Sequence, residues 1–174
     1  MKPCIVVAGP PGSGKSTVGP LLADRLGVAF RDNDDEIVLR SGRTISDIFT
    51  TDGEPAFRAL EESTIAEALA EHEGVLSVGG GAVLAPGTRK RLRGHQVVFL
   101  NVGFPTGVQR VGLSTARPLL AGVNPRATYK SLLDARLPVY REVATIEVAT
   151  DERTPEEVVA VIVAELSKKL EKTQ

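Results

Sequence analysis

A phosphate-binding loop is the clearest chemical signal in the sequence. Four residues separate Gly9 from Gly14, and Lys15 and Ser16 follow directly, within the run GPPGSGKST. Glycines at this spacing let the backbone turn tightly and direct N–H groups towards an anion, helped by the positive end of the next helix. Lys15 supplies a mobile charge for the β- and γ-phosphates, and the Ser16 hydroxyl is placed to ligate Mg²⁺. The motif predicts that a nucleoside triphosphate is bound by Gly12, Ser13, Gly14, Lys15, Ser16 and Thr17.

Two missing motifs narrow the class of nucleotide enzyme. The sequence has no Asn-Lys-x-Asp for guanine, and its one Asp-x-x-Gly, residues 24–27, falls in the predicted first helix, where it cannot contact a γ-phosphate. We therefore do not expect a GTPase switch. No later apolar strand ends in Asp, so carboxylates on the metal side must come from elsewhere. Asp32 and Asp34 stand two apart where the second predicted strand ends, and one can face Mg²⁺ while the other faces an acceptor hydroxyl. For Asp35 and Glu36 we favour the first turn of a helix.

A triple glycine follows the third predicted strand. Each glycine gives up conformational entropy on folding, so Gly79, Gly80 and Gly81 together indicate a backbone that a ligand approaches closely. A flexible turn or a tight passage from strand to helix is the alternative.

Three arginines are candidates for binding anions. Arg117 lies in residues 112–124, where two glycines and a proline interrupt the regular pattern, which predicts a mobile lid carrying a cation to the phosphates. Arg58 has the alternative role of an ion pair with Glu62, four residues on. Arg136 has the alternative role of interacting with the C-terminal dipole of a helix.

Strand-like and helical segments alternate along the whole chain. Apolar runs at residues 4–8, 28–31, 75–78, 97–102 and 144–150 predict parallel strands. Helical periodicity covers residues 15–26 and 54–71, and a last helix begins with an N-cap at Thr154, a proline and a capping-box glutamate at Glu157. We predict an α/β fold in three layers, a five-stranded parallel sheet covered by helices on both faces, in one domain over residues 1–174. Its ligands would sit at the carboxyl ends of the strands.

Composition excludes several classes of protein. The 174 residues carry 21 Lys and Arg against 22 Asp and Glu, so no strong basic field is available for nucleic acid or an anionic membrane. The single cysteine, Cys4, is interpreted as a small buried hydrophobe in a reducing compartment. His72 and His95 are expected to be surface or capping residues. With no signal peptide and no conspicuous exposed apolar face, we expect a cytoplasmic monomer.

The motifs together resemble those of a shikimate kinase over almost the whole chain. They are the loop GPPGSGKST, the pair Asp32 and Asp34, and the segments SGRTISDIFTTDGEPAFRALE, VGGGAV, ARPLL and RLPVYREVA. The resemblance implies a P-loop kinase fold with an acceptor-binding segment over about 32–61 and a lid over about 112–124. It also implies ATP-dependent phosphorylation of the 3-hydroxyl of shikimate, which gives shikimate 3-phosphate and ADP.

Roles at the acceptor site follow from the same resemblance. Asp34 would contact the acceptor hydroxyls. Independently of the resemblance, phosphoryl transfer through a loose transition state needs only a weak base, so we expect Asp34 to have an ordinary pKa of about 4 and to accept a proton late in the transfer. Arg58, oriented by Glu61, would clamp the shikimate carboxylate together with Arg136, because the planar guanidinium fork forms two parallel charge-assisted bonds. The remaining contacts would come from the glycine backbone and an apolar wall, namely Gly79, Gly80, Gly81, Ile45, Phe49 and Phe57.

The resemblance also implies which residues contact the nucleotide. Lys15 and Arg117 would stabilise the transferring phosphoryl group, and Ser16 and Asp32 would lie on the Mg²⁺ side. The residues that would flank adenine are Arg110 and Pro155.

One position departs from the family pattern, and two other functions stay open. Asn33 stands where the family usually has Thr or Ser, which puts a supporting hydrogen bond in question. Another small-metabolite kinase, such as a gluconate kinase, would share the loop and lid but not the combination of Arg58, the triple glycine and Arg136. A non-catalytic ATP-binding module would bind nucleotide without transferring phosphate to any acceptor.

Overall fold

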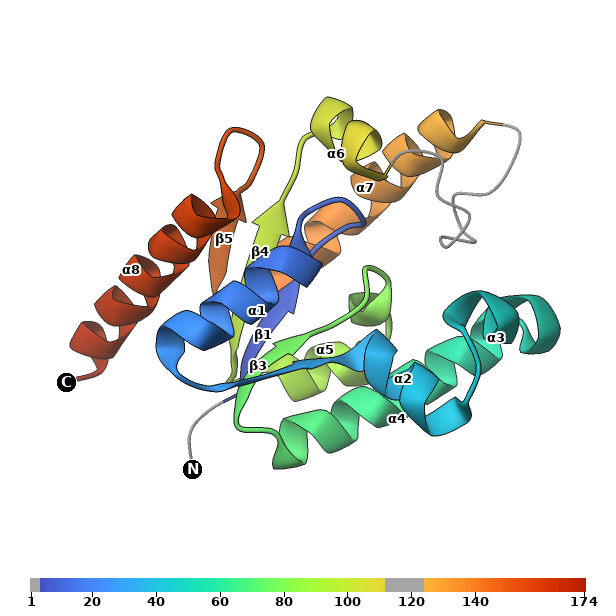
Figure 1. Ribbon diagram of the computed structural model, residues 1–174, viewed down its shortest axis with the longest axis horizontal. Coiled ribbons are helices and arrows are strands. Elements are labelled where there is room, and N and C mark those ends of the chain that lie inside the picture. Colours follow the sequence, from blue (N-terminus) through green and yellow to red (C-terminus); the bar gives the residue numbers. More distant parts are fainter. Residues whose placement is uncertain (1–3, 112–123) are drawn as a thin grey trace.

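The computed structural model describes residues 4–111 and 124–174 and has a parallel sheet at its centre (Figure 1). Five strands lie in the order β2-β3-β1-β4-β5, and every neighbouring pair is parallel. Their bounds are β1 Ile5–Ala8, β2 Ala29–Asp32, β3 Gly74–Ser77, β4 Gln96–Asn101 and β5 Ile146–Ala149. The predicted α/β sheet is confirmed, with each strand end within two residues of its expected place.

Helices cover both faces of this sheet. Alternate side chains of β1 explain why, since Val6 and Ala8 point to one face and Val7 to the other. Helices α1 and α8 pack on the Val7 side, and α4, α5 and α7 pack on the Val6 side (Figure 1). The bounds are α1 Lys15–Leu26, α2 Asn33–Ser41, α3 Ile45–Asp52, α4 Glu54–Glu71, η1 Ala82–Leu84, α5 Pro86–Leu92, α6 Phe104–Val111, α7 Pro125–Val143 and α8 Pro155–Thr173.

A smaller apolar cluster joins α2, α3 and α4 beside the sheet. Ile37, Ile48 and Phe57 are buried at its centre, and Ile45 and Phe49 are partly buried against them. This arrangement places most of residues 32–61 as one packed unit next to the carboxyl ends of β2 and β3 (Figure 1).

Helix ends follow the local sequence. Gly27 ends α1 in the left-handed region, at φ +67°, and its N–H reaches the Ala23 and Asp24 carbonyls. The predicted capping box at Thr154 and Glu157 opens α8. Helix α7 continues through Pro138 to Val143, so the alternative role of Arg136 at a helix C-terminus is wrong.

Several other expectations can be placed. Cys4 is buried, which raises the pKa of its thiol to about 11 and fits its interpretation as a small hydrophobe. His72 is the C-cap of α4, and its Nε2 lies 3.0 Å from the Val75 carbonyl. His95 Nδ1 lies 3.4 Å from the Cys4 carbonyl. Arg117 and almost all of the predicted lid lie outside the described residues. Among the described helices, none is both long and apolar enough to cross a lipid bilayer.

Candidate active site

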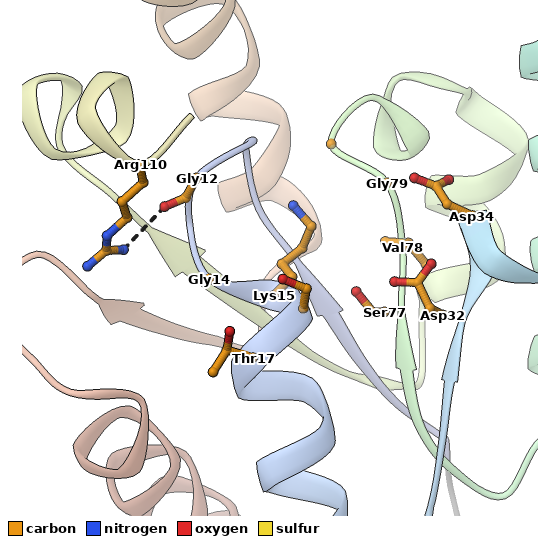
Figure 2. Close-up of a pocket in the computed structure, with 12 residues that line it drawn as sticks. Gly12, Gly14, Lys15, Thr17, Asp32, Asp34, Ser77, Val78, Gly79 and Arg110 are labelled. Atoms are coloured by element: carbon orange, nitrogen blue, oxygen red, sulfur yellow. Dashed lines mark hydrogen bonds between the residues drawn. The ribbon is translucent and has the colours of Figure 1, made fainter. Parts of the chain in front are cut away.

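A cavity of about 360 Å³ opens where the carboxyl ends of β1, β2 and β3 meet (Figure 2). It is lined by the phosphate loop, by the ends of β2 and β3 and by one arginine of α6. The lining residues are Gly12, Gly14, Lys15, Ser16, Thr17, Asp32, Asp34, Ser77, Val78, Gly79, Gly80 and Arg110. Parallel strands collect their carboxyl ends at one edge, so residues far apart in the sequence meet here, as the topology predicts.

The phosphate loop has a backbone that requires glycine. Gly12 and Gly14 have φ of +83° and +96°, in the left-handed region, and an added Cβ on Gly12 would lie 2.9 Å from the Gly107 carbonyl oxygen. Lys15 Nζ donates to the carbonyl oxygens of Gly9, at 2.5 Å, and Pro10, at 3.1 Å. The ammonium group therefore lies over the loop at the floor of the cavity, at the N-terminal end of α1 (Figure 2).

The two aspartates after β2 differ in their surroundings. Asp32 is the N-cap of α2, because its Oδ1 accepts a hydrogen bond of 3.0 Å from the Asp35 N–H. Asp35 and Glu36 stand in the first turn of α2, as predicted. Asp34 is directed towards Gly79 (Figure 2), and its Oδ1 is buried with no hydrogen-bond partner among the described residues.

Asp34 has an unusually high pKa. Burial is the largest cause, and the neighbouring carboxylates of Asp32 and Glu61 add to it, so the pKa rises from 3.8 to about 6. Lys15 and Arg58 oppose the rise with their positive charges. The expectation of an ordinary pKa is therefore wrong, because the sequence does not show how deeply the α2 helix start is buried.

Arg58 is held by a buried carboxylate. Its Nη1 donates to Glu61 Oε1 at 2.8 Å and its Nε to Glu54 Oε1 at 3.3 Å, and its guanidinium carbon lies 5.3 Å from the centre of the Phe57 ring. Glu61 is 3% exposed, and burial raises its pKa although Arg58 lowers it. The alternative pairing of Arg58 with Glu62 does not form.

Glu62 instead accepts a hydrogen bond of 3.1 Å from Arg91 of α5. The choice between Glu61 and Glu62 therefore rests on packing that brings α5 alongside α4.

The triple-glycine turn lies between these charged groups. An added Cβ on Gly79 would lie 2.9 Å from Glu61 Oε2 and 3.2 Å from Asp34 Oδ1, and one on Gly81 would lie 2.6 Å from the Arg58 guanidinium carbon. The chain passes at once into η1, so the tight passage from strand to helix is also present. A side chain at Gly79 or Gly81 would therefore have to displace the charged ends of Glu61 or Arg58, so glycine lets these groups keep their positions against the backbone.

Arg136 reaches the same turn from α7. It is 7% exposed in α7, and an added Cβ on Gly80 would lie 3.4 Å from its Nη1. The turn thus brings Arg58, Arg136 and Asp34 around one short stretch of backbone, next to the phosphate loop.

Of the three residues predicted to form the apolar wall, Phe57 is buried and two are more accessible. Phe57 is 3% exposed, and its ring centre lies 4.7 Å from that of Phe49. Phe57 therefore supports Phe49 from within the cluster, and the more accessible members are Ile45 and Phe49.

A second cavity, of about 280 Å³, lies beside the first. The two share Gly14, Thr17 and Arg110, and Pro155 lines the second together with Ser13, Val18, Thr150, Arg153 and Val158. Arg110 donates to the carbonyl oxygens of Gly12, at 3.2 Å (Figure 2), and Thr150, at 3.0 Å. The structure therefore brings the two predicted adenine neighbours to one cavity beside the phosphate loop.

Sequence reasoning missed several lining residues. Ser77 ends β3 and Thr150 directly follows β5, and a polar residue at the carboxyl end of a parallel strand is a signal that could have identified both. Arg153 had no comparable signal, because its contact with the cavity depends on the turn between β5 and α8. Asn33, the departure from the family pattern, is fully buried and its amide has no partner among the described residues.

Comparison with known proteins agrees with this geometry. The family model described as shikimate kinase matches residues 11–167. A shikimate kinase of Saccharopolyspora erythraea is 66% identical over 163 residues, which cover 94% of this chain and 93% of that protein. The solved structure of a shikimate kinase from Acinetobacter baumannii in complex with shikimate has a TM-score of 0.93 at 37% identity, covering 98% of this chain and 96% of that one.

The fold is also found in a kinase of another family. A gluconokinase from Sinorhizobium meliloti 1021 has a TM-score of 0.61 at 23% identity, covering 98% of this chain and 95% of that one, a likeness that shows the fold alone. The family match and the high identity over nearly the full length go further than the fold, and the chain therefore belongs to the shikimate kinase family.

Proposed function

We propose that this protein transfers the γ-phosphoryl group of ATP to the 3-hydroxyl of shikimate, giving shikimate 3-phosphate and ADP. The observation that carries the proposal is the glycine turn beside the phosphate loop. Arg58, Arg136 and Asp34 all approach it, and the cavity contains both Asp34 and Lys15. The solved complex of a 37% identical relative with shikimate supports the same acceptor.

The nucleotide would occupy the two neighbouring cavities. Adenine fits the one lined by Arg110 and Pro155, and the phosphates would lie over the N–H groups of residues 12–17. Lys15 would exchange its bonds to the Gly9 and Pro10 carbonyls for the β- and γ-phosphate oxygens, because a charge-assisted bond to phosphate is stronger than one to a neutral carbonyl.

Mg²⁺ fits the oxygens at the floor of the cavity. Among the described residues no three His, Cys, Asp or Glu side chains group to hold a metal ion. Ser16 and Asp32 nevertheless share the cavity wall, although the Asp32 carboxylate also accepts backbone hydrogen bonds at the start of α2. Mg²⁺ is usually held by one or two protein oxygens together with substrate phosphates, and it would neutralise phosphate charge here.

Asp34 would orient the acceptor hydroxyl and receive its proton. In the transfer, a bond forms between the shikimate oxygen and the γ-phosphorus, the bond to the ADP oxygen breaks, and the hydroxyl proton passes to Asp34. A pKa of about 6 makes Asp34 a better base than an exposed aspartate while keeping it mostly ionised at neutral pH.

Arg58 and Arg136 would hold the shikimate carboxylate from two sides of the glycine turn. Glu61 keeps Arg58 in place through the bond of 2.8 Å, so the guanidinium is oriented before the acid binds. Two fixed cations around one carboxylate set the direction of the ring and hence which hydroxyl faces the phosphate.

A coupled assay of ADP release tests the proposal. Purified protein with Mg²⁺ and ATP is given shikimate, gluconate or no acceptor, and we expect shikimate alone to give rapid release with shikimate 3-phosphate as product. Release that depends on gluconate would favour the other small-metabolite kinase, and ATP binding without release for either acid would favour a non-catalytic module.

We further propose a cytoplasmic monomer that acts on small molecules without nucleic-acid or membrane partners. The formal charge of −1 supports this proposal. Among the described residues, the large apolar side chains that are exposed are spread over α2, η1 and α8. Sedimentation equilibrium of the purified protein tests the monomer.

A further inference from the structure

Helix α7 touches both substrate-binding loops through its two tyrosines. Tyr129 and Tyr140 are the chain's only tyrosines, and both are almost fully buried, at 2% and 1% exposure. The Tyr129 hydroxyl donates to the Pro11 carbonyl of the phosphate loop at 2.6 Å. The Tyr140 hydroxyl donates to the Gly80 carbonyl of the triple-glycine turn at 2.5 Å. About three helical turns separate them, so they lie on the same face of α7.

Packing leaves neither ring room to move. The Tyr129 ring lies against α6, where an added Cβ on Gly107 would come within 2.8 Å of its Cε1. The Tyr140 ring stacks on Phe99 of β4, with ring centres 4.9 Å apart. Burial raises the pKa of Tyr140 to about 12, so its hydroxyl keeps the proton that it donates.

The two loops that these tyrosines hold also touch each other. An added Cβ on Gly80 would lie 3.2 Å from Pro11 Cδ and 3.5 Å from the Gly9 carbonyl oxygen. A small shift of either loop would therefore change the spacing between the nucleotide and the acceptor. Arg136 lies one turn before Tyr140 on α7 and approaches the same Gly80.

We propose that Tyr129 and Tyr140 are positioning residues, which use α7 as a common support to hold the nucleotide loop and the acceptor loop in register. Tyr129 serves the nucleotide and Tyr140, together with Arg136, serves the acid. The proposal rests on the proposed function only in taking shikimate as that acid. Removing one hydroxyl takes this donor away from the Pro11 or the Gly80 carbonyl, and the corresponding loop loses that support. In Tyr140→Phe the hydrogen bond between Tyr140 and the Arg136 side chain is lost as well, which also affects the acid.

Two substitutions that keep the ring test this division of roles. We expect Tyr140→Phe to raise the KM for shikimate about tenfold and leave the KM for ATP nearly unchanged. We expect Tyr129→Phe to do the reverse, so each variant is the matched control of the other. A purely structural role would lower the melting temperature and the active fraction while leaving both KM values unaltered. That result, or an equal rise of both KM values in both variants, would overturn the proposal.

Tyrosine fluorescence gives a second readout that needs no turnover. The chain has no tryptophan, so Tyr129 is the remaining emitter in Tyr140→Phe and Tyr140 in Tyr129→Phe. Titration with ADP should change the emission of Tyr129, and titration with shikimate should change that of Tyr140. Emission of Tyr129 that does not respond to ADP, or emission of either tyrosine that responds only to the opposite ligand, would overturn the proposal. Emission of Tyr140 that does not respond to shikimate, in a protein that phosphorylates shikimate, would overturn it as well.

Wild-type protein provides the same measurement without a substitution. ADP and shikimate, added separately, should each change its emission, and the two changes should be of different size. If shikimate is not the acid, it leaves the wild-type emission unchanged while the ADP response of Tyr129 persists. Failure of the proposed function is thereby distinguished from failure of the positioning role.

Discussion

Replacing Asp34 by Asn should stabilise the free protein while it removes activity. Burial and two nearby carboxylates raise the pKa of Asp34 from 3.8 to about 6, which means that folding disfavours its ionised form. Each pK unit corresponds to about 1.4 kcal/mol, so ionised Asp34 lowers the free energy of unfolding by up to about 3 kcal/mol. Solvent at the rim of the cavity screens part of this electrostatic effect, so we expect Asp34→Asn to raise the free energy of unfolding by about 1 to 3 kcal/mol.

The size of the stabilisation depends on pH. A raised pKa in the folded state means that the contribution of Asp34 to stability is fully present below its unfolded pKa of 3.8 and is lost as pH rises through about 6. Asparagine resembles the protonated acid at every pH. The gain in stability from Asp34→Asn should therefore be near zero at the acid end and reach its full value above pH 6.

Urea denaturation of both proteins across this range measures the effect. Above pH 6 the variant should unfold at higher urea, and its melting temperature should rise by about 2 to 10 °C for a domain of this size. Its kcat should fall by about 10²- to 10⁴-fold, as expected for loss of a general base. The exposed neighbour Asp35, changed to Asn, is the control and should show neither effect. A variant that is less stable, or equally stabilised at all pH values, would refute the reasoning.

Three further outcomes test the site. Arg58→Ala should raise the KM for shikimate about 10- to 100-fold and leave the KM for ATP unchanged. Arg91 forms an exposed ion pair with Glu62, so the control variant Arg91→Ala should change neither KM. A normal shikimate KM in Arg58→Ala would show that Arg58 does not bind the carboxylate. Gly81→Ala should also raise the shikimate KM, because the new methyl would lie 2.6 Å from the Arg58 guanidinium carbon. Gly94 has open space around it but a φ of +88°, so Gly94→Ala should lower stability without affecting that KM. Similar kinetics for the two alanine variants would contradict this steric explanation. The pH profile of kcat/KM for shikimate should fall on the acid side with an apparent pKa near 6, as Asp34 in the free enzyme takes up a proton. A profile that stays flat to about pH 5 would show that Asp34 is not the base.

The sequence by itself determined those features that depend on neighbours along the chain. The phosphate loop, the five strands, the spans of α1 and α4, and the capping box at Thr154 use hydrogen bonds and side-chain periodicity within a few residues, so their patterns are visible without a fold. The spans of α3, α5, α6 and α7 were not predicted. Strand alternation with helices also predicted the parallel sheet, and with it the edge at which Asp34 and the glycine turn meet the loop.

Tertiary structure decided which partners the charged and hydroxyl groups have. Glu61 rather than Glu62 holds Arg58, because Glu62 faces α5 and binds Arg91. The high pKa of Asp34 comes from burial and from nearby carboxylates, which include Glu61 of another helix. Neither cause can be read from the residues next to Asp34 in the sequence. The two tyrosine bonds span 118 and 60 residues, and distances of that kind exist only once the helices have packed on the sheet.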